Sequence, residues 1–178
     1  MSALLRGKVS VVTGGAQGIG LAIAERLAVE GSRVMIGDVR HEEAERQAER
    51  LRGAGLDVRA AVLDVTDPVS VARAAEECTT ELGEIDVLVA NAGILRLGPA
   101  LDMDIATWRS VIDVNLTGVF VCCQEFAGRM VRRGRGGRIV VMSSLFGRRG
   151  GRDNTAYSAS KFGAIGLAES LEIGRAHV

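Results

Sequence analysis

The sequence predicts an α/β fold in which one parallel β-sheet carries helices on both faces. Short, continuous apolar runs recur along the chain, a pattern typical of strands that are buried on both faces. Amphipathic segments of helical length separate these runs. A glycine-rich turn follows the first run, where the first strand would lead into the first helix. Regular alternation of strands and helices favours a parallel sheet.

Strands and helices are expected in strict alternation. The expected strands are Val9–Val12, Arg33–Gly37, Asp57–Leu63, Ile85–Ala90 and Arg138–Met142. The expected helices are Leu21–Glu30, His41–Arg52, Pro68–Leu82, a long one that follows Asp104 and runs to about Arg133, and a last one from about Thr155. Pro68 marks a helix start because the first helical turn tolerates proline. Asp104 is expected to cap the long helix.

These elements suit a Rossmann-like, doubly wound sheet with the strand order 3-2-1-4-5, with the later strands missing. A length of 178 residues fits one domain, and we expect residues 1–171 to form it. Residues 172–178 do not continue the pattern and match a translated sequencing adapter, so we expect a non-native tail there. The alternative is a natural helix end with a glycine cap at Gly174.

The composition is that of a soluble globular protein. Hydrophobic residues make up 47%, charged residues 25%, and the formal net charge is zero, so no charge imbalance points to nucleic acid or an acidic membrane. We expect a cytoplasmic protein, because no apolar run approaches the length of a membrane span. The three cysteines are expected to be buried thiols, and with only two histidines the chain predicts no metal site.

The turn after the first strand has the spacing of a phosphate-binding loop. Gly14 would permit the tight turn, Gly18 would let the backbone approach a pyrophosphate, and Gly20 would let helix and strand pack closely. The N-terminus of the following helix offers free N–H groups and partial positive charge to phosphates. We therefore predict a dinucleotide site, whose first segment also contains Gln17 and Ile19.

Asp38 ends the second strand and predicts which dinucleotide is bound. A carboxylate at this point accepts hydrogen bonds from ribose hydroxyls and repels the 2′-phosphate of NADP. Gln17 adds no compensating cation; Arg40 is near enough to supply one, and the simpler interpretation is a solvated charge at the start of a helix. We therefore expect NAD as the cofactor, in preference to NADP.

Polar and small residues follow the third and fourth strands, at the same edge of the expected sheet. Asp64 and Val65 are candidates for contacts with the adenine, through the carboxylate and a backbone donor. An acidic turn that starts the next helix explains Asp64 equally well. Asn91, Ala92 and Gly93 supply small residues where the cofactor would pass.

Tyr157 and Lys161 form the candidate catalytic pair. Tyr157 is the only tyrosine, and Lys161 is one of two lysines in a chain that otherwise uses arginine. Residues four apart share one face of a helix. A phenol is too weak an acid to act as a general base at neutral pH, but a nearby ammonium and an oxidised nicotinamide both favour the phenolate.

The loop after the fifth strand offers two further features. Ser143 and Ser144 would place a hydroxyl in the same cleft, where it donates to a substrate carbonyl. Turn formation is the simpler explanation of a serine pair when it is considered alone. Arg148, Arg149 and Arg152 favour either an anionic or acyl-carrier substrate or, more simply, a solvated basic loop.

Together these features resemble the short-chain dehydrogenase/reductase family over about residues 6–171. The matched motifs are Thr13-Gly14-xxx-Gly18-x-Gly20, Asp64-Val65, Asn91-Ala92-Gly93, Asn115 within Val114–Gly118, Ser144, and Tyr157-xxx-Lys161. The family spacing selects Ser144 over Ser143. The resemblance also adds Asn115, which in the family lies at a helix distortion and helps to hold a proton-relay water. One departure is Ala90, where many members carry a second asparagine.

The resemblance implies an NAD(P)-dependent oxidoreductase that interconverts a secondary alcohol and a ketone by hydride transfer. Tyr157 would be the general acid/base, and Lys161 would stabilise the phenolate and bind the nicotinamide ribose. Ser144 would hold the substrate oxygen, and Asn115 would complete the proton relay. Residues 1–171 would then form a single, incomplete NAD-binding domain.

Family members continue beyond this sequence with more strands and a substrate lid. We therefore expect an exposed fifth strand and a chain that folds poorly and is weakly active. A full-length parent would form a homotetramer or homodimer through the helices at about Ile105–Arg133 and Thr155–Leu171. The expected partner is a small-molecule alcohol or ketone, with no nucleic acid and no membrane. The alternatives are a non-catalytic dinucleotide-binding sensor and an inactive truncated fragment.

Overall fold

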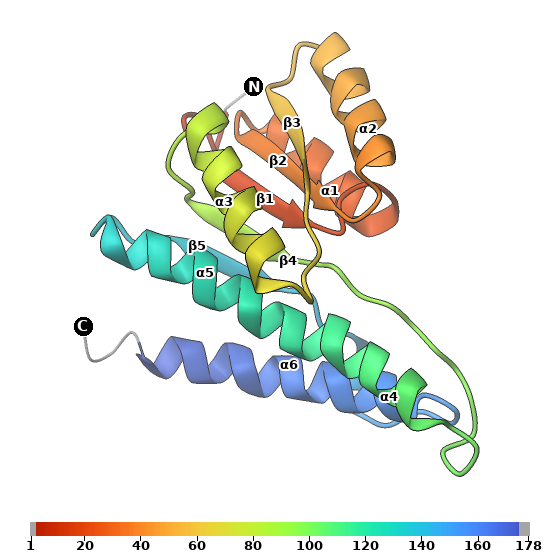
Figure 1. Ribbon diagram of the computed structural model, residues 1–178. Coiled ribbons are helices and arrows are strands. Elements are labelled where there is room, and N and C mark those ends of the chain that lie inside the picture. Colours follow the sequence, from red (N-terminus) through yellow and green to blue (C-terminus); the bar gives the residue numbers. More distant parts are fainter. Residues whose placement is uncertain (1–2, 175–178) are drawn as a thin grey trace.

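Parallel strands form one sheet in the computed structural model, which describes residues 3–174 (Figure 1). The strands are β1 (Val9–Thr13), β2 (Arg33–Asp38), β3 (Val58–Val62), β4 (Val87–Ala90) and β5 (Arg138–Val141). Their order is β3-β2-β1-β4-β5, and every neighbouring pair is parallel. The predicted fold class and strand order are therefore confirmed.

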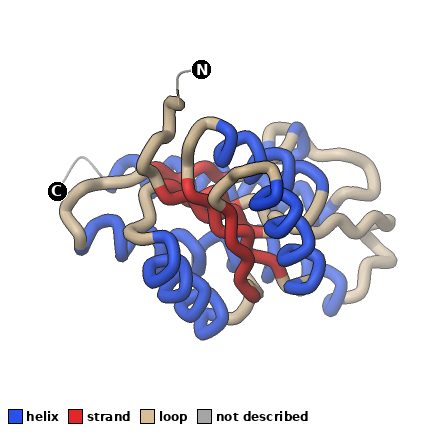
Figure 2. The backbone as a smooth tube through the Cα atoms, turned by 90° about the horizontal axis from the view of Figure 1, so that it is seen from above, coloured by secondary structure: helices blue, strands red, loops and turns tan. Residues whose placement is uncertain are grey.

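Helices cover the sheet on both faces (Figure 2). They are α1 (Gly18–Val29), α2 (His41–Gly53), α3 (Pro68–Leu82), α4 (Ile105–Ile112), α5 (Gly118–Arg132) and α6 (Thr155–Gly174). Val12 and Ile36 are buried under α1 and α2, whereas Val11 and Met35 are buried on the face of α3 and α5. Successive residues of a strand point to opposite faces, so a sheet covered on both sides needs continuous apolar runs.

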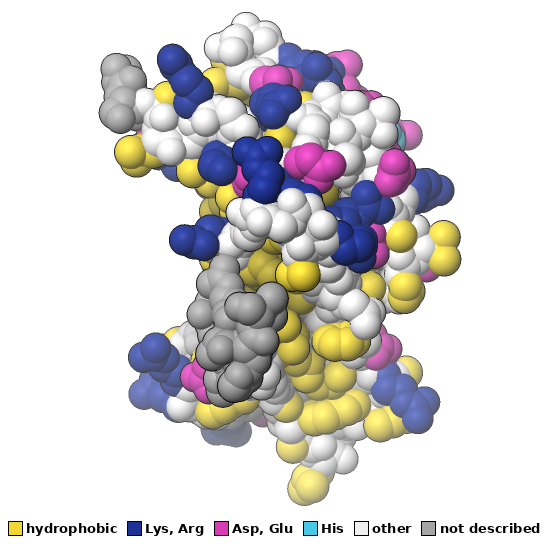
Figure 3. Space-filling model, turned by 90° about the vertical axis from the view of Figure 1, so that its left-hand side faces the viewer, with side chains coloured by type: hydrophobic (Ala, Val, Ile, Leu, Met, Phe, Trp, Pro, Cys, Tyr) yellow, Lys and Arg dark blue, Asp and Glu magenta, His cyan; other side chains and the backbone are white. Residues whose placement is uncertain are grey.

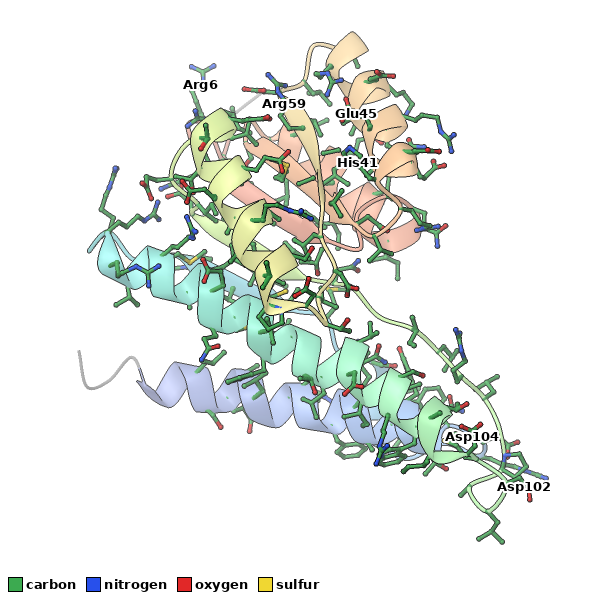
Figure 4. All side chains as sticks on the ribbon, viewed as in Figure 1. Arg6, His41, Glu45, Arg59, Asp102 and Asp104 are labelled. Carbon is green, nitrogen blue, oxygen red and sulfur yellow. The ribbon has the colours of Figure 1, made fainter. Side chains whose placement is uncertain are left out.

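Two aspartates begin helices as predicted. The Asp67 carboxylate accepts a hydrogen bond from the N–H of Val69 at 2.9 Å, with Pro68 at the first position of α3. The Asp104 carboxylate accepts from the N–H of Thr107 at 2.7 Å, at the start of α4 (Figure 4). Each carboxylate satisfies an N–H group that has no partner within its helix.

The helix expected between Asp104 and Arg133 is interrupted. A π-helical segment, η1 (Asp113–Thr117), separates α4 from α5, and Asn115 lies inside it. The distortion that the family resemblance implied at Asn115 is therefore confirmed, and the expectation of one regular helix is wrong. Such π-bulges are frequent at functional sites.

The stretch Ile105–Arg132 is long and apolar enough to cross a membrane by length and composition alone. The expectation that no segment approaches such a length is therefore wrong. Within the described residues this stretch is a core element, because Val119, Cys122, Phe126 and Met130 are buried in the cluster that contains α3 and the sheet. Its apolar side chains thus serve packing inside the protein.

The three cysteines are free and buried, as predicted. Burial raises the pKa of the Cys78 and Cys122 thiols to about 12 and that of the Cys123 thiol to about 11. These thiols stay protonated at neutral pH, so they act as small core side chains.

β5 forms one edge of the sheet. Ile139 and Val141 pack against the core, whereas Val140 between them is 47% exposed. Figure 3, which views the molecule from the left-hand side of Figure 1, shows hydrophobic side chains gathered below the middle of that face. The expected exposure of the fifth strand is thus observed for the residues that face away from α5 and α6.

The last helix, α6, begins at Thr155 as predicted, and its backbone runs to Gly174. Residues 172–174 of the expected tail therefore continue the helix. Residues 175–178 lie outside the described part of the chain, so the non-native tail stays a prediction.

Candidate active site

A cleft of about 520 Å³ opens where the strands end, at the carboxyl-terminal edge of the sheet. All thirteen residues predicted to hold a dinucleotide line this cleft. They are Gly14, Gln17, Gly18, Ile19, Gly20, Asp38, Asp64, Val65, Asn91, Ala92, Gly93, Tyr157 and Lys161. Ligands of doubly wound sheets bind at this edge, and the fold brings the predicted residues together there.

Apolar residues complete the walls of the cleft. They are Val39, Leu63, Ile94, Leu95, Val114 and Met142. We did not single them out from the sequence, because an apolar residue next to a strand end has the same pattern as a core residue. The basic loop after β5 behaves differently: Arg148, Arg149 and Arg152 are exposed and do not line the cleft. The simpler interpretation, a solvated loop, therefore fits these arginines.

Close packing explains two glycines in the turn between β1 and α1. Gly14 has a φ of +63°, and a Cβ on it would lie 2.8 Å from the Cα of Ala92. A Cβ on Gly20 would run into the carbonyl oxygen of Gly14 and lie 2.5 Å from the amide nitrogen of Asn91. Both positions therefore exclude a side chain, because a loop from another part of the sheet lies directly against them.

Hydrogen bonds brace β1 against the loop after β4. The Thr13 hydroxyl accepts from the N–H groups of Asn91 and Ala92, both at 3.0 Å. The Asn91 amide donates in return to the carbonyls of Thr13 at 2.9 Å and Gly14 at 3.1 Å. We missed this role of Thr13 in the sequence, although its place at the end of a buried strand, next to the first glycine, was the available signal.

Asp38 ends β2 and is almost entirely buried, with 4% of the residue exposed. The carboxylate accepts from the N–H of Ala16 at 3.1 Å and from the N–H of Arg40 at 3.0 Å. The Arg40 Nε lies 3.4 Å from the same carboxylate, and its Nη1 donates to the Gln17 side chain at 2.7 Å. The interpretation of Arg40 as only a solvated charge is therefore wrong, because its guanidinium bridges two polar residues that line the cleft.

Asp64 takes part in the turn that leads from β3 into α3. Its Oδ1 accepts from the N–H of Thr66 at 2.9 Å and from the hydroxyl of Thr66 at 2.7 Å. Its own N–H donates to the Ser70 hydroxyl at 3.0 Å. The helix-initiating interpretation is confirmed, and because Asp64 also lines the cleft the two interpretations are compatible.

Tyr157 and Lys161 lie one turn apart on α6. The Lys161 ammonium lies 5.8 Å from the centroid of the Tyr157 ring and donates to the carbonyl of Met142 at 2.7 Å. Lys161 is only 4% exposed, and this burial lowers the pKa of its ammonium. A positive charge is thus held beside the phenol in a place where water screens its field weakly.

The buried ammonium predicts a pH dependence of stability. Because the Lys161 pKa is lowered in the folded chain, the unfolded chain binds this proton more tightly. The wild-type free energy of unfolding, relative to that of Lys161→Met, should rise with pH between the folded pKa and the unfolded value of about 10.4. The rise amounts to about 1.4 kcal/mol for each pH unit that separates the two pKa values. Urea unfolding between pH 7 and pH 10 measures it, and a constant difference would contradict it.

Asn115 is fully buried in η1 and does not line the cleft. Its Oδ1 accepts from the N–H of Ile94 at 2.7 Å, and its Nδ2 donates to the carbonyl of Ile94 at 2.9 Å. The Nδ2 also donates to the Ser160 hydroxyl at 3.2 Å, which in turn donates to the Tyr157 carbonyl at 2.7 Å. Asn115 therefore ties the loop after β4 to the helix that carries Tyr157, and its part in a proton relay stays a prediction.

The two serines after β5 have different partners. Ser143 lines the cleft, and its hydroxyl donates to the Lys161 carbonyl at 3.0 Å. The Ser144 hydroxyl accepts from the N–H of Phe146 at 3.2 Å and caps the short helix η2 (Leu145–Gly147). Turn formation at Ser144 is thus observed, and its contact with a substrate oxygen stays a prediction.

The parallel sheet, the glycine-rich turn and the Tyr157–Lys161 pair at one cleft define a doubly wound α/β protein whose ligand cleft lies where the strands end. A family model described as short chain dehydrogenase matches residues 8–176. The chain belongs to the short-chain dehydrogenase family. Members of this family are oxidoreductases that use NAD(P).

Relatives and solved structures agree with this membership. D-threitol dehydrogenase of Mycolicibacterium smegmatis is 42% identical over 94% of this chain and 64% of its own length. Cis-4-hydroxycyclohexanecarboxylate dehydrogenase of Sinomonas cyclohexanicum is 43% identical over 93% of this chain and 66% of its own length. A short-chain type dehydrogenase/reductase structure from Mycobacterium marinum has a TM-score of 0.93 at 31% identity, over 98% of this chain and 70% of that one. The chain thus spans 64–66% of the length of these two curated relatives.

Proposed function

We propose that the whole protein is an NAD(P)-dependent oxidoreductase that interconverts a secondary alcohol and a ketone, with Tyr157 as general acid/base. The observation that carries the proposal is the Tyr157–Lys161 pair, which lines the same cleft as the glycine-rich turn. The names of the relatives, which are dehydrogenases and reductases, support oxidoreductase chemistry.

The residues of the cleft fit a nicotinamide dinucleotide. Gly18 has a φ of +55°, and a Cβ on it would meet nothing within 4 Å, so the start of α1 is open toward a phosphate. The Asp38 carboxylate suits a ribose, and Asp64 and Val65 suit the adenine. When bound, the cofactor supplies the hydride acceptor or donor that side chains lack.

The chain's own residues would handle the proton and the substrate oxygen. Tyr157 takes the proton from the alcohol in the oxidation direction and returns it to the carbonyl oxygen in the reduction direction. The ammonium of Lys161 stabilises the phenolate. Ser144 donates its hydroxyl hydrogen to the substrate oxygen as negative charge develops there, while its oxygen keeps accepting from the N–H of Phe146. Asn115 keeps the loop after β4 and the helix of Tyr157 together.

The proposed cofactor is NAD in preference to NADP, because of the buried charge on Asp38. Removing this charge removes the repulsion of a 2′-phosphate. In Asp38→Ala the ratio of kcat/KM for NAD to that for NADP should fall at least about tenfold, which corresponds to roughly 1.4 kcal/mol. Asp38→Asn keeps the size and one acceptor and removes only the charge, so its ratio should fall in the same direction. An unchanged ratio in both variants would refute the assignment.

Arg40→Ala is the matched control for this prediction. The Arg40 guanidinium lies beside the Asp38 carboxylate and partly compensates its charge. Without it the carboxylate repels a 2′-phosphate more strongly, so the preference for NAD should increase. Steady-state kinetics with both cofactors compare the three variants in one assay.

A screen of alcohols, sugars and 3-oxoacyl thioesters with NAD tests the proposed reaction. The substrates in the relatives' names range from D-threitol to a hydroxysteroid and a 3-oxoacyl-[acyl-carrier-protein], so relatedness alone does not select the substrate. Tight NADH binding without turnover of any substrate would favour the non-catalytic sensor instead.

We also propose a soluble cytoplasmic homotetramer or homodimer, formed through α4, α5 and α6. Large apolar side chains are exposed on these helices: Phe120, Val131 and Phe162 are 46–65% exposed. Exposed apolar side chains gathered on neighbouring helices are typical of a protein–protein interface.

A further inference from the structure

We propose that Phe146 is a positioning residue for Tyr157: its ring fixes the orientation of the phenol, and Gly151 provides the space in which the Phe146 ring lies. The inference rests on the proposed function, because Tyr157 is assigned there as the general acid/base. It gives a role to the loop between Ser144 and Tyr157, which no motif in the sequence explains.

The orientation of the Tyr157 phenol depends on ring contacts. Within residues 3–174, Tyr157 forms hydrogen bonds through its backbone but none through its hydroxyl. The Phe146 ring lies edge-to-face with the Tyr157 ring, with centroids 6.4 Å apart and an interplanar angle of 77°. This is a preferred geometry for an aromatic pair. The Phe146 ring therefore restricts the orientations open to the phenol.

The loop holds the Phe146 ring in place. The backbone N–H of Phe146 donates to the Ser144 hydroxyl at 3.2 Å. Gly147 is buried, and a Cβ on it would lie 2.8 Å from the Lys161 carbonyl oxygen, so η2 is pressed against α6. A Cβ on Gly151 would run into the Phe146 ring and lie 2.7 Å from its Cδ1. The ring thus contacts the backbone of Gly151 as well as Tyr157, and it has little room to move.

Two neighbouring glycines allow a matched test of this contact. The φ angles of both Gly150 and Gly151 lie outside the left-handed region, so either backbone accepts alanine. A Cβ on Gly150 would meet nothing within 4 Å, whereas a Cβ on Gly151 meets the Phe146 ring. Gly151→Ala therefore displaces the ring, and Gly150→Ala adds the same methyl group without touching it.

The first readout needs no substrate. Tyr157 is the only tyrosine, so a protein labelled on tyrosine gives one set of tyrosine ring signals by NMR. In Phe146→Leu, which keeps an apolar side chain but has no ring, the Tyr157 signals should lose their ring-current shift. Gly151→Ala should move the same signals, and Gly150→Ala should leave them in place. Tyr157 signals that are the same in Phe146→Leu and the wild type would overturn the proposal.

The second readout is turnover with NAD and an alcohol that the wild type oxidises. Gly151→Ala should lower kcat about 10- to 100-fold with little change in the KM for NAD, because a misplaced acid/base slows the chemical step. Phe146→Leu alone should lower kcat about tenfold, and this variant keeps the test valid if Gly151→Ala does not fold. In the double variant, the smaller leucine leaves room for the new methyl group, so kcat should equal that of Phe146→Leu instead of showing the product of the two losses.

Two results would count against the positioning role. Equal kcat in Gly151→Ala and Gly150→Ala, although the tyrosine signals move, would overturn it. So would additive losses in the double variant, because additivity means that the two residues act independently. By contrast, normal turnover in Tyr157→Phe would overturn the proposed function itself, so the two failures are distinguishable.

Discussion

Tyr157→Phe is expected to abolish turnover while leaving NADH binding nearly unchanged. The substitution removes one oxygen atom, the atom proposed to exchange a proton with the substrate. The remaining ring keeps its edge-to-face contact with Phe146, so the loop after β5 should stay in place. General acid/base catalysis contributes roughly 10²- to 10⁴-fold, and a kcat reduced at least about 10³-fold is therefore expected. Initial-rate kinetics give the loss, and titration of NADH fluorescence gives the binding.

The two lysines of the chain provide a matched control for this result. Lys161→Met removes the charge beside the phenol and should also lower kcat strongly. Lys8 lies just before β1 and forms an ion pair with Asp86 at 3.2 Å. This pair lies at the amino-terminal ends of the strands, whereas the cleft lies at their carboxyl-terminal ends. Lys8→Met should therefore keep its turnover. A Tyr157→Phe protein that retains a kcat within tenfold of the wild type would refute the acid/base role.

The fold could be predicted because its constraints are local in the sequence. Val11 and Val12 point to opposite faces of the sheet and enter different hydrophobic clusters, so both must be apolar. The same requirement along each strand produces apolar runs that stand out between amphipathic helices. The π-helical break was different. Asn115 in that segment bonds to the backbone of Ile94, 21 residues earlier, and a helical periodicity does not reveal such a contact.

The location of the candidate site could be predicted for a related reason. In a parallel sheet, residues that follow different strands meet at one edge, so Gly14, Asp38 and Asn91 reach the same cleft. The partners of their side chains could not be predicted. The Asn91 amide bonds to the glycine-rich turn, and Arg40 folds back onto Asp38 and Gln17. Those partners depend on how loops distant in sequence pack against one another.

Gly20→Ala is expected to destabilise the protein strongly and to weaken dinucleotide binding. The new Cβ would run into the carbonyl oxygen of Gly14 and lie 2.5 Å from the amide nitrogen of Asn91. Neither group is the free end of a flexible side chain. The Gly14 carbonyl belongs to the backbone of the turn, and the Asn91 amide is held by its bonds to the carbonyls of Thr13 and Gly14. The clash with the new Cβ can therefore be relieved only if the turn and the loop after β4 move apart.

The expected cost combines two effects. Overpacking of a tight contact costs about 1–3 kcal/mol, and loss of the Asn91 hydrogen bonds costs about 1 kcal/mol for each bond. With two such bonds the loss is roughly 3–5 kcal/mol, and after the gain of about 1 kcal/mol in helix propensity we expect the free energy of unfolding to fall by roughly 2–4 kcal/mol. Binding of NADH should weaken as well, because the displaced turn is the segment proposed to approach the pyrophosphate. Urea unfolding and NADH titration measure the two effects separately.

Gly166→Ala is the control that isolates packing from helix propensity. Gly166 is also a helical glycine, in α6, but it is exposed and a Cβ on it would meet nothing within 4 Å. Alanine favours a helix over glycine by about 1 kcal/mol, so this variant should be more stable than the wild type. The propensity gain acts in the same direction at both positions, so a loss at Gly20 must come from the contacts with Gly14 and Asn91. A Gly20→Ala protein as stable as Gly166→Ala would show that the turn can move away from Asn91, and the packing explanation of Gly20 would then be wrong.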